Sequence, residues 1–397
     1  MDFCSRLICL LQLLFREDTL IISHIRTKAA GPYLFTEVET DDGHTGIGEA
    51  GDWAHLDAAK TQIENFAEYF IGKDPRTIEH HWQYIQRSTF FRSSVILSAL
   101  ASIDIALWDL KGKALGVPVY DLLGGRTRNK VRSYAVAMGE TPDEIAESCL
   151  KVRELGFDAA RIILPSFKDA TLSAADQVYA RRVAAAIEKV QACRDAVGPD
   201  FDLCVEAHRA YSVTEAIAIG HGIASATPLF FEDPIAPESV DAMAMVVSSI
   251  EIPVATGERA VSLAECAALL KVGVQILRPD VCALGGITPS HKAAVLAESA
   301  GAHIAPHNPL GPVSTAACMQ LDLSSSAFLI QEFPSFNVDG SENSMLQEPL
   351  VVNGGYLEAP TRPGIGISLA SDIEQRFPAK QRGLTPAIGF DGSVVAR

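Results

Sequence analysis

The sequence predicts an α/β protein: a modified (β/α)8 barrel of the TIM type that carries an α+β capping domain. The chain has 397 residues, 48% of them hydrophobic, which is too many for one small core and fits two domains or a barrel with additions. Up to about residue 125, strand patterns precede helical ones. Beyond that point, short apolar runs alternate with capped helices, as successive parallel β/α units do.

We therefore expect three parts. A capping domain covers residues 1–127 and includes an extension over 1–18, the barrel covers 128–335, and a segment over 336–397 returns to the cap. The extension holds an apolar run over 7–15 that resembles the core of a signal peptide. Arg16-Glu17-Asp18 follows where a small-residue cleavage site should lie, so we interpret the run as an N-terminal extension or a first helix.

Two periodicities predict the elements of the cap. Alternation over 34–40, the turn signal Asp41-Asp42-Gly43 and a further run over 45–49 indicate strands. From about residue 54 the pattern becomes helical, and Gly116 with Pro118 gives a stop signal. One helix face is marked by Ile96, Leu100, Ile103, Leu107 and Leu110.

Eight short apolar runs predict the barrel strands. Their alternation with helices indicates parallel strands, and eight such units across about 200 residues favour a closed barrel. The runs cover 131–138, 159–164, 203–207, 229–232, 253–257, 274–278, 303–306 and 328–332.

Capping residues set the helix boundaries between these runs. Capping boxes are predicted at Thr141 with Glu144, Ser212 with Glu215, and Ser262 with Glu265. Thr288-Pro289 predicts a cap with proline at the first helical position. Three helices are expected to end at Gly156, Gly273 and Gly301.

Composition restricts the function classes. The net charge of −16 repels phosphate backbones and anionic lipid, so we expect no nucleic-acid or membrane-surface role. The eight cysteines are scattered without a C-x-x-C pair, which indicates reduced thiols and a cytoplasmic location. No apolar run reaches 18 residues, so a membrane-spanning helix is not expected.

Acidic and histidine side chains stand at the carboxyl ends of successive runs. In this fold the strand ends surround one mouth, where active sites are built. The first three acids are 26 residues apart from one to the next. From the third run to the eighth, the residues are Glu206, Glu232, Glu258, Asp280, His307 and Glu332.

Three glutamates at one mouth predict a metal site. Glu206, Glu232 and Glu258 would repel one another unless a cation neutralised them. Oxygen ligands with open positions for substrate and water suit Mg²⁺, or Mn²⁺, better than zinc. The alternative is that each glutamate is an ordinary ion-paired residue. That interpretation would suit a single glutamate, but it suits three glutamates at equivalent strand positions less well.

Two histidines and an arginine are the candidate reactive groups. Asp280 could hold one ring nitrogen of His307 and leave the other as a base, unless His307 is simply packed in its turn. His208 lies two residues after Glu206 on the same side of the strand, so it could donate a proton, or be solvent-facing. Arg161, always protonated, either binds a carboxylate or forms a structural ion pair near the barrel floor.

Motifs along nearly the whole chain support one family resemblance. They are VETDDG at 38–43, GIGE at 46–49, DIALWDLKG at 104–112, FEDP at 231–234, ATGER at 255–259, RPD at 278–280, GG at 285–286 and APHNP at 305–309. Together they resemble the mandelate-racemase-like branch of the enolase superfamily. Within it, acid-x-His at 206–208 and PHNPLGP at 306–312 most resemble galactonate-type sugar-acid dehydratases.

The resemblance implies a reaction and its residues. It implies Mg²⁺-dependent dehydration of an aldonate or aldarate to a 2-keto-3-deoxy acid through an enediolate, with His307 as base, His208 as acid and Glu332 beside the substrate carboxylate. Cap loops at 30–33 and 51–55, with Tyr33 and Trp53, would close over the mouth and bind the substrate. We expect a small acid sugar as the partner and a homo-oligomer of two to eight copies.

Two departures keep alternatives open. Racemases of the branch carry Lys-x-Lys on the second strand, where this chain has Arg161-Ile162-Ile163, and the first metal ligand is usually Asp rather than Glu206. An epimerase or lactone cycloisomerase could use His307 alone. A mannonate-type dehydratase would need a tyrosine base, for which Tyr211 is poorly placed. A non-catalytic metal-binding scaffold would need none of the reactive groups.

Overall fold

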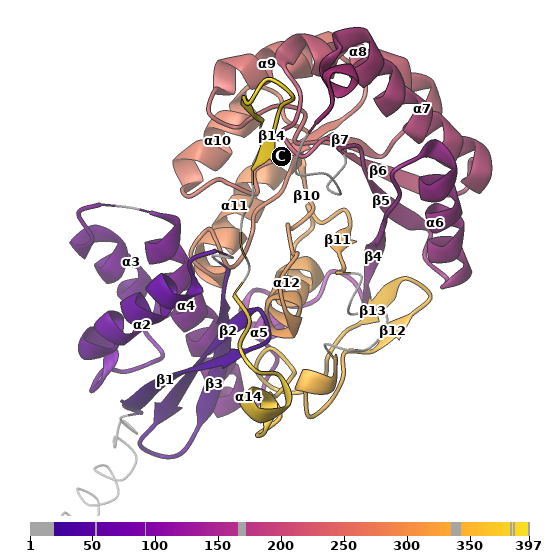
Figure 1. The fold of residues 1–397 in the computed structure, drawn as a ribbon. Helices are drawn as coiled ribbons and strands as arrows, with labels where there is room; N and C mark the ends of the chain where they lie inside the picture. The colour runs from indigo at the N-terminus through magenta and orange to yellow at the C-terminus, as the bar shows by residue number, and fades with distance from the viewer. Residues whose placement is uncertain are drawn as a thin grey trace, which may run out of the picture.

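The computed structural model describes residues 20–51, 54–91, 93–165, 172–334, 343–381, 383 and 386–395. A small cap and a larger barrel lie side by side, and the C-terminal segment runs between them (Figure 1). An α/β barrel with an N-terminal cap was predicted, and that fold class is confirmed. The extension over 1–18 lies outside the described residues, and the boundaries at 127 and 335 stay predictions.

The cap packs helices on a three-stranded antiparallel sheet. The strands are β1 (Ile22–Ala30), β2 (Tyr33–Thr40) and β3 (Thr45–Ala50), and the helices are α2 (Leu56–Phe70), α3 (Ile78–Ser88), α4 (Ser94–Leu115) and α5 (Val119–Leu122). α4 stops at Gly116, as predicted, with a φ of 71° that glycine adopts freely. β3 packs so closely on α4 that a Cβ on Gly48 would lie 1.8 Å from the Ser102 carbonyl oxygen.

Eight strands form the parallel barrel within the described part of the chain. β11 pairs with β4, and an Ile304–Phe328 bridge joins β10 to the segment before β11, so the barrel closes. The strands are β4 (Lys130–Ala137), β5 (Ala159–Ile163), β6 (Asp202–Glu206), β7 (Phe230–Glu232), β8 (Val254–Thr256), β9 (Ile276–Leu277), β10 (His303–Ile304) and β11 (Gln331–Glu332). Each matches one of the eight predicted runs.

Helices cover the outside of the barrel, one after each strand from β4 to β10 (Figure 1). They are α6 (Pro142–Glu154), α7 (Tyr179–Val197), α8 (Val213–Ile223), α9 (Val240–Ser249), α10 (Leu263–Lys271), α11 (Ile287–Ser299) and α12 (Pro312–Ser324). The short 3-10 turns η1 (Ala174–Gln177) and η2 (Ala224–Ala226) adjoin α7 and α8.

The predicted helix starts are mostly confirmed. Thr141 and Ser212 form complete capping boxes, and Ser262 caps α10, although Glu265 accepts the backbone N–H of Val261 instead of that of Ser262. The cap predicted at Thr288 is wrong. α11 already begins at Ile287, with Gly286 at the N-cap position and no side-chain cap of its own.

The C-terminal segment contacts both parts of the molecule. Its elements are η3 (Asn343–Met345), β12 (Val352–Asn353), β13 (Tyr356–Glu358), α14 (Ile373–Arg376), β14 (Ala387–Ile388) and β15 (Val394–Val395), and β13 pairs with β4. Near α14, Gly31 donates to the Phe377 carbonyl at 2.8 Å and accepts from Lys380 at 2.7 Å. A tight turn therefore joins β1 to β2 and is held by the C-terminal segment, and closure of residues 30–33 over the mouth stays a prediction.

Among the described helices, none is long and apolar enough to cross a membrane.

Candidate active site

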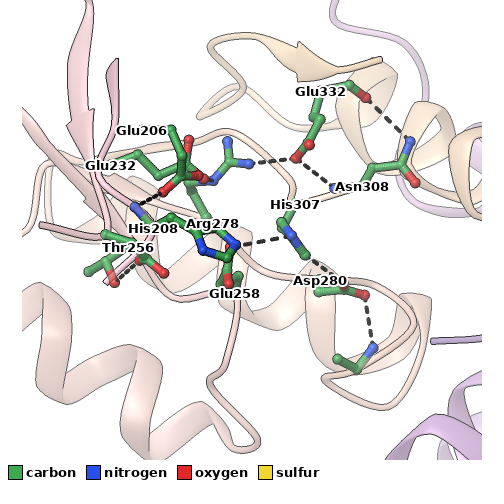
Figure 2. A network of polar contacts seen from close by, with 12 residues as sticks. Glu206, His208, Glu232, Thr256, Glu258, Arg278, Asp280, His307, Asn308 and Glu332 are labelled. Carbon is green, nitrogen blue, oxygen red and sulfur yellow. Dashed lines mark hydrogen bonds and ion pairs between the residues drawn. The ribbon is translucent and has the colours of Figure 1, made fainter. Parts of the chain in front are cut away.

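The three predicted metal ligands lie together at the mouth of the barrel. Glu206 and Glu232 end β6 and β7, and Glu258 follows β8 (Figure 2). One carboxylate oxygen of each lies within 4.8 Å of the others. Parallel pairing of β6 with β7 puts Glu206 directly opposite Glu232, which is why a constant spacing in sequence becomes a cluster in space.

These carboxylates are short of compensating partners. Glu206 Oε2 and both oxygens of Glu232 are buried without a hydrogen bond. Burial raises the pKa of Glu206 well above its usual range, and repulsion from Glu232 adds to the shift. Burial also raises the pKa of Glu232. Oxygen donors that are buried, close together and under-coordinated fit a hard divalent cation such as Mg²⁺ or Mn²⁺.

Two arginines partly neutralise the cluster. Arg161 Nη1 lies 2.9 Å from Glu332, 3.5 Å from Glu206 and 3.9 Å from Glu232, so this side chain belongs to the mouth and not to the barrel floor. Arg278 is fully buried, with Nε 2.5 Å from Glu232 and Nη2 2.7 Å from Glu332. Sequence reasoning gave Arg278 no role; its place two residues before Asp280 was the available signal.

The expected histidine–aspartate pair is formed. His307 Nδ1 lies 2.7 Å from Asp280 Oδ2, and Asp280 Oδ1 accepts backbone N–H groups of Cys282 and Ala283 at 2.8 and 2.9 Å. His307 Nε2 faces Glu258 Oε2 at 3.3 Å. Burial lowers the pKa of His307, but Glu258 and the Asp280 hydrogen bond outweigh burial and raise the pKa to about 9.

His208 occupies a strained turn beside the cluster. Its backbone N–H donates to Glu206 Oε1 at 2.5 Å, and its φ of 49° and that of 64° at Arg209 are left-handed values unusual for non-glycine residues. Burial, and then the Arg209 charge with Nη2 2.9 Å from the ring, lowers the pKa of His208 to about 4. A general acid needs the opposite shift, so the acid role requires a different position of Arg209.

Arg209 was not predicted from the sequence, although it follows His208 directly. Its Nη1 contacts Glu258 and lies 3.1 Å from Asp233. Its backbone N–H also donates to the Asp233 carbonyl at 2.8 Å. Arg209 therefore ties the turn after β6 to the ends of β7 and β8.

Glu332 is held rigidly at the end of β11. Its Oε2 accepts from Arg278 and from the Asn308 backbone N–H at 3.0 Å (Figure 2). The Asn308 side chain donates to Thr315 Oγ1 at 2.8 Å and accepts from Ser314 Oγ at 2.8 Å. The residue after His307 thus joins the last strand to the start of α12.

The two predicted cap contacts are untested. Tyr33 is buried in β2, with its ring centroid 6.1 Å from that of Phe35. Trp53 lies outside the described residues. Both stay predictions as substrate-binding residues.

Two family models match the chain. Residues 17–124 match the N-terminal domain of mandelate racemase and muconate lactonizing enzyme, and residues 144–373 match the enolase C-terminal domain-like family.

Curated relatives are similar over almost their full length. D-galactonate dehydratase of Variovorax paradoxus is 35% identical over 357 residues, which are 88% of this chain and 92% of the relative. D-galactonate dehydratase of Xanthomonas oryzae pv. oryzae is 36% identical over 365 residues, which are 89% and 94% of the two chains.

Solved structures share the fold. An enolase from Agrobacterium radiobacter, bound to sodium and L-malate, superposes with a TM-score of 0.87 at 27% identity and covers 95% of this chain and 100% of its own. A member of the enolase superfamily from Salmonella Typhimurium gives 0.83 at 27% identity, with 90% and 98% covered.

Proposed function

This chain belongs to the enolase superfamily, in the mandelate racemase and muconate lactonizing enzyme family, and we propose that it dehydrates a sugar acid to a 2-keto-3-deoxy acid. Its curated relatives are dehydratases and align over 92% and 94% of their own lengths, so the chain is an enzyme of the hydro-lyase class. The substrate we propose is an aldonate or aldarate of the galactonate type.

One observation carries the proposal. A histidine locked by a carboxylate, His307 on Asp280 at 2.7 Å, faces a carboxylate cluster in which Glu206 Oε2 and both oxygens of Glu232 are buried without a hydrogen bond. The first group suits proton abstraction, and the second suits a divalent cation. Neither is needed for stability alone, because unpaired buried charge costs free energy.

The substrate carboxylate would lie between the cluster and Glu332. Arg161 Nη1, 2.9 Å from Glu332, is positioned to pair with that carboxylate. Glu206, Glu232 and Glu258 would hold Mg²⁺, which when bound supplies positive charge opposite the charge that develops on the substrate carboxylate.

The protein groups then move two protons. His307 Nε2 takes the proton from the carbon next to the carboxylate, while Asp280 fixes the ring through Nδ1. With Arg209 moved away from its ring, His208 gives a proton to the departing β-hydroxyl, which leaves as water. The substrate thus loses one α-proton and one hydroxyl, and the enol product tautomerises to the 2-keto-3-deoxy acid.

A substrate screen tests this function. Purified protein with Mg²⁺ would be incubated with mono- and di-acid sugars, and 2-keto-3-deoxy products would be detected with semicarbazide, beside the His307→Asn and His208→Asn variants. Product that both variants abolish supports dehydration. Solvent deuterium uptake next to the carboxylate that depends on His307, without product, would instead support an epimerase or cycloisomerase. The absence of both product and exchange with every acid sugar tested would contradict the proposal.

A further inference from the structure

Three barrel helices, α7, α11 and α12, lack a side-chain N-terminal cap of their own, and two of them, α11 and α12, adjoin the proposed reaction site. α6, α8 and α10 each begin with a serine or threonine whose side chain accepts a backbone N–H. α11 and α12 begin at Gly286 and Gly311, which have no side chain to do this. Their first-turn N–H groups are buried and need acceptors. α11 follows the strand end with Asp280, and α12 follows the one with His307.

The cap domain supplies the missing acceptors. Glu49, at the end of β3, accepts from the backbone N–H of Gly311 at 2.7 Å through Oε1 and from that of Ser314 at 2.8 Å through Oε2. Asp104, on α4, accepts from the Thr288 backbone N–H at 3.0 Å and its hydroxyl at 2.6 Å. Negative charge at a helix N-terminus is favourable, so each carboxylate both caps and neutralises.

The glycines make room for these carboxylates. A Cβ on Gly311 would lie 2.8 Å from Glu49 Oε1, and one on Gly286 would lie 2.2 Å from Asp104 Oδ2. The small residue at each helix start and the acid in the other domain therefore form one arrangement. It also gives a place in the structure to the GIGE and DIALWDLKG motifs, whose acids are Glu49 and Asp104.

Short contacts connect Glu49 to the reaction site. Ser314, whose N–H it accepts, donates its hydroxyl to Asn308 Oδ1 at 2.8 Å. Asn308 directly follows His307, and its backbone N–H donates to Glu332. Residues 307–311 form one short segment that runs from His307 to Gly311. Because Glu49 accepts the Gly311 N–H, it holds one end of the backbone that carries His307. Glu49, Asn308 and Ser314 are all fully buried.

We propose that Glu49 is a positioning residue for His307, which it orients by capping α12 from the other domain. Asp104 does the same for Asp280 by capping α11. The proposal rests on the proposed function in so far as His307 is the reacting base. It makes the cap domain part of the machinery that aligns the base, in addition to covering the mouth.

The first test compares Glu49→Gln with a matched control, Asp109→Asn. Asp109 is also a fully buried cap carboxylate, and among the described residues its donors are the backbone N–H groups of Ile47 and Ile365 at 2.9 and 2.8 Å and Lys113 Nζ at 2.6 Å, none of which belongs to α11 or α12. We expect Glu49→Gln to speed hydrogen exchange in residues 306–316 about tenfold, and to lower kcat about tenfold with KM little changed. Asp109→Asn, at a similar loss of Tm, should keep kcat within about twofold.

A rescue separates capping from packing. Gly311 has a φ of −80°, which serine adopts, and Glu49→Ala removes the two nearest atoms that a Cβ there would meet, leaving Tyr33 Cδ1 at 3.1 Å. Glu49→Ala combined with Gly311→Ser should recover several-fold of the kcat lost in Glu49→Ala and slow the local exchange again. Loss of kcat that only follows loss of Tm, equally in the Asp109 control, would overturn the proposal, as would restored protection without restored kcat.

One readout needs no substrate. The proton that His307 Nδ1 shares with Asp280 should give a downfield proton resonance, assigned by its absence in His307→Asn. We expect Glu49→Gln to shift or broaden this resonance while Asp109→Asn leaves it in place. An unchanged resonance in Glu49→Gln overturns the positioning role even if no sugar acid proves to be a substrate.

Discussion

Two regions of this protein bury carboxylates, and they do so in opposite ways. At the seam, defined by the cap carboxylates Glu49 and Asp104 against the barrel and Asp109 against the C-terminal segment, the carboxylates accept backbone N–H groups from other elements. At the mouth, Glu206 and Glu232 are buried to a similar degree but keep oxygens without hydrogen bonds. The seam carboxylates hold the backbone of neighbouring elements, whereas the free oxygens of Glu206 and Glu232 are available to bind a ligand.

The pKa values of Asp104 and Glu206 differ in line with their hydrogen bonds. Burial raises the pKa of Asp104 to about 7, and the hydrogen bonds from Thr288 limit the rise. Burial raises the pKa of Glu206 well above its usual range, and Glu232 raises it further. Hydrogen bonds to the charged form explain the smaller shift at the seam. The comparison predicts that mouth variants lose function with little loss of stability, whereas seam variants lose stability and affect activity only through the positioning of His307 and Asp280.

The largest expected effect is on the rate constant at the mouth. His307→Asn removes the proposed base, so we expect kcat to fall by about a thousandfold. The Tm of the variant should stay close to that of the native protein, because the mouth is not optimised for stability. Steady-state kinetics and a thermal melt would check both, and a large loss of Tm would break the division between the two regions.

The next effect concerns metal affinity. Glu206→Gln should weaken Mg²⁺ or Mn²⁺ binding by about a hundredfold in calorimetry, since one of three oxygen donors loses its charge. At a free concentration of about 100 times its Kd, the cation should stabilise the native protein by about 2.7 kcal/mol, and chelation of the cation should remove this gain. The metal-free variant should be at least as stable as the metal-free native protein. Marked destabilisation would show that Glu206 is structural.

A pH effect of about 2 kcal/mol is expected at the seam. The pKa of Asp104 is about 7 folded and about 3.9 unfolded, so between these values the folded state holds the extra proton. Its contribution to the free energy of unfolding therefore falls as pH rises, by about 2 kcal/mol from pH 5 to pH 7. Urea titrations at both pH values would compare the native protein with Asp104→Asn. An equal pH dependence in both would contradict the assignment.

The smallest effect provides a baseline for both regions. Thr141 caps α6 with its own capping box and lies neither at the mouth nor at the seam. Thr141→Ala should cost about 1 kcal/mol of stability, with kcat within about twofold. A larger fall in kcat would mean that any loss of stability lowers activity, and the seam results would then need to be corrected for it.

Local signals explain why much of the site was predictable. Each of Glu206, Glu232 and Glu258 ends an apolar run, and a closed barrel brings all such ends to one mouth. The spacing thus carried three-dimensional information. The same reasoning placed Asp280 beside His307, and the structure joins them at 2.7 Å. Arg161 could not be assigned between two roles until its contacts with three glutamates were seen.

The failure at Thr288 shows the limit of local reasoning. Thr288-Pro289 has the residues of a helix start, but the acid that caps α11 stands 184 residues earlier in the chain. Threonine and proline there are compatible with a cap and do not require one. Nothing near Gly286 or Gly311 announces that Asp104 or Glu49 will fill the space beside them.

The sequence by itself determined the class of fold, the eight strands and the acids and histidines at their ends, because these depend on periodicity and on the order of elements. Only the tertiary structure decided which charges are compensated. Whether a buried carboxylate meets a backbone N–H, an arginine or no donor depends on groups tens to hundreds of residues away. That difference separates the seam from the mouth, and it follows from how the cap packs on the barrel.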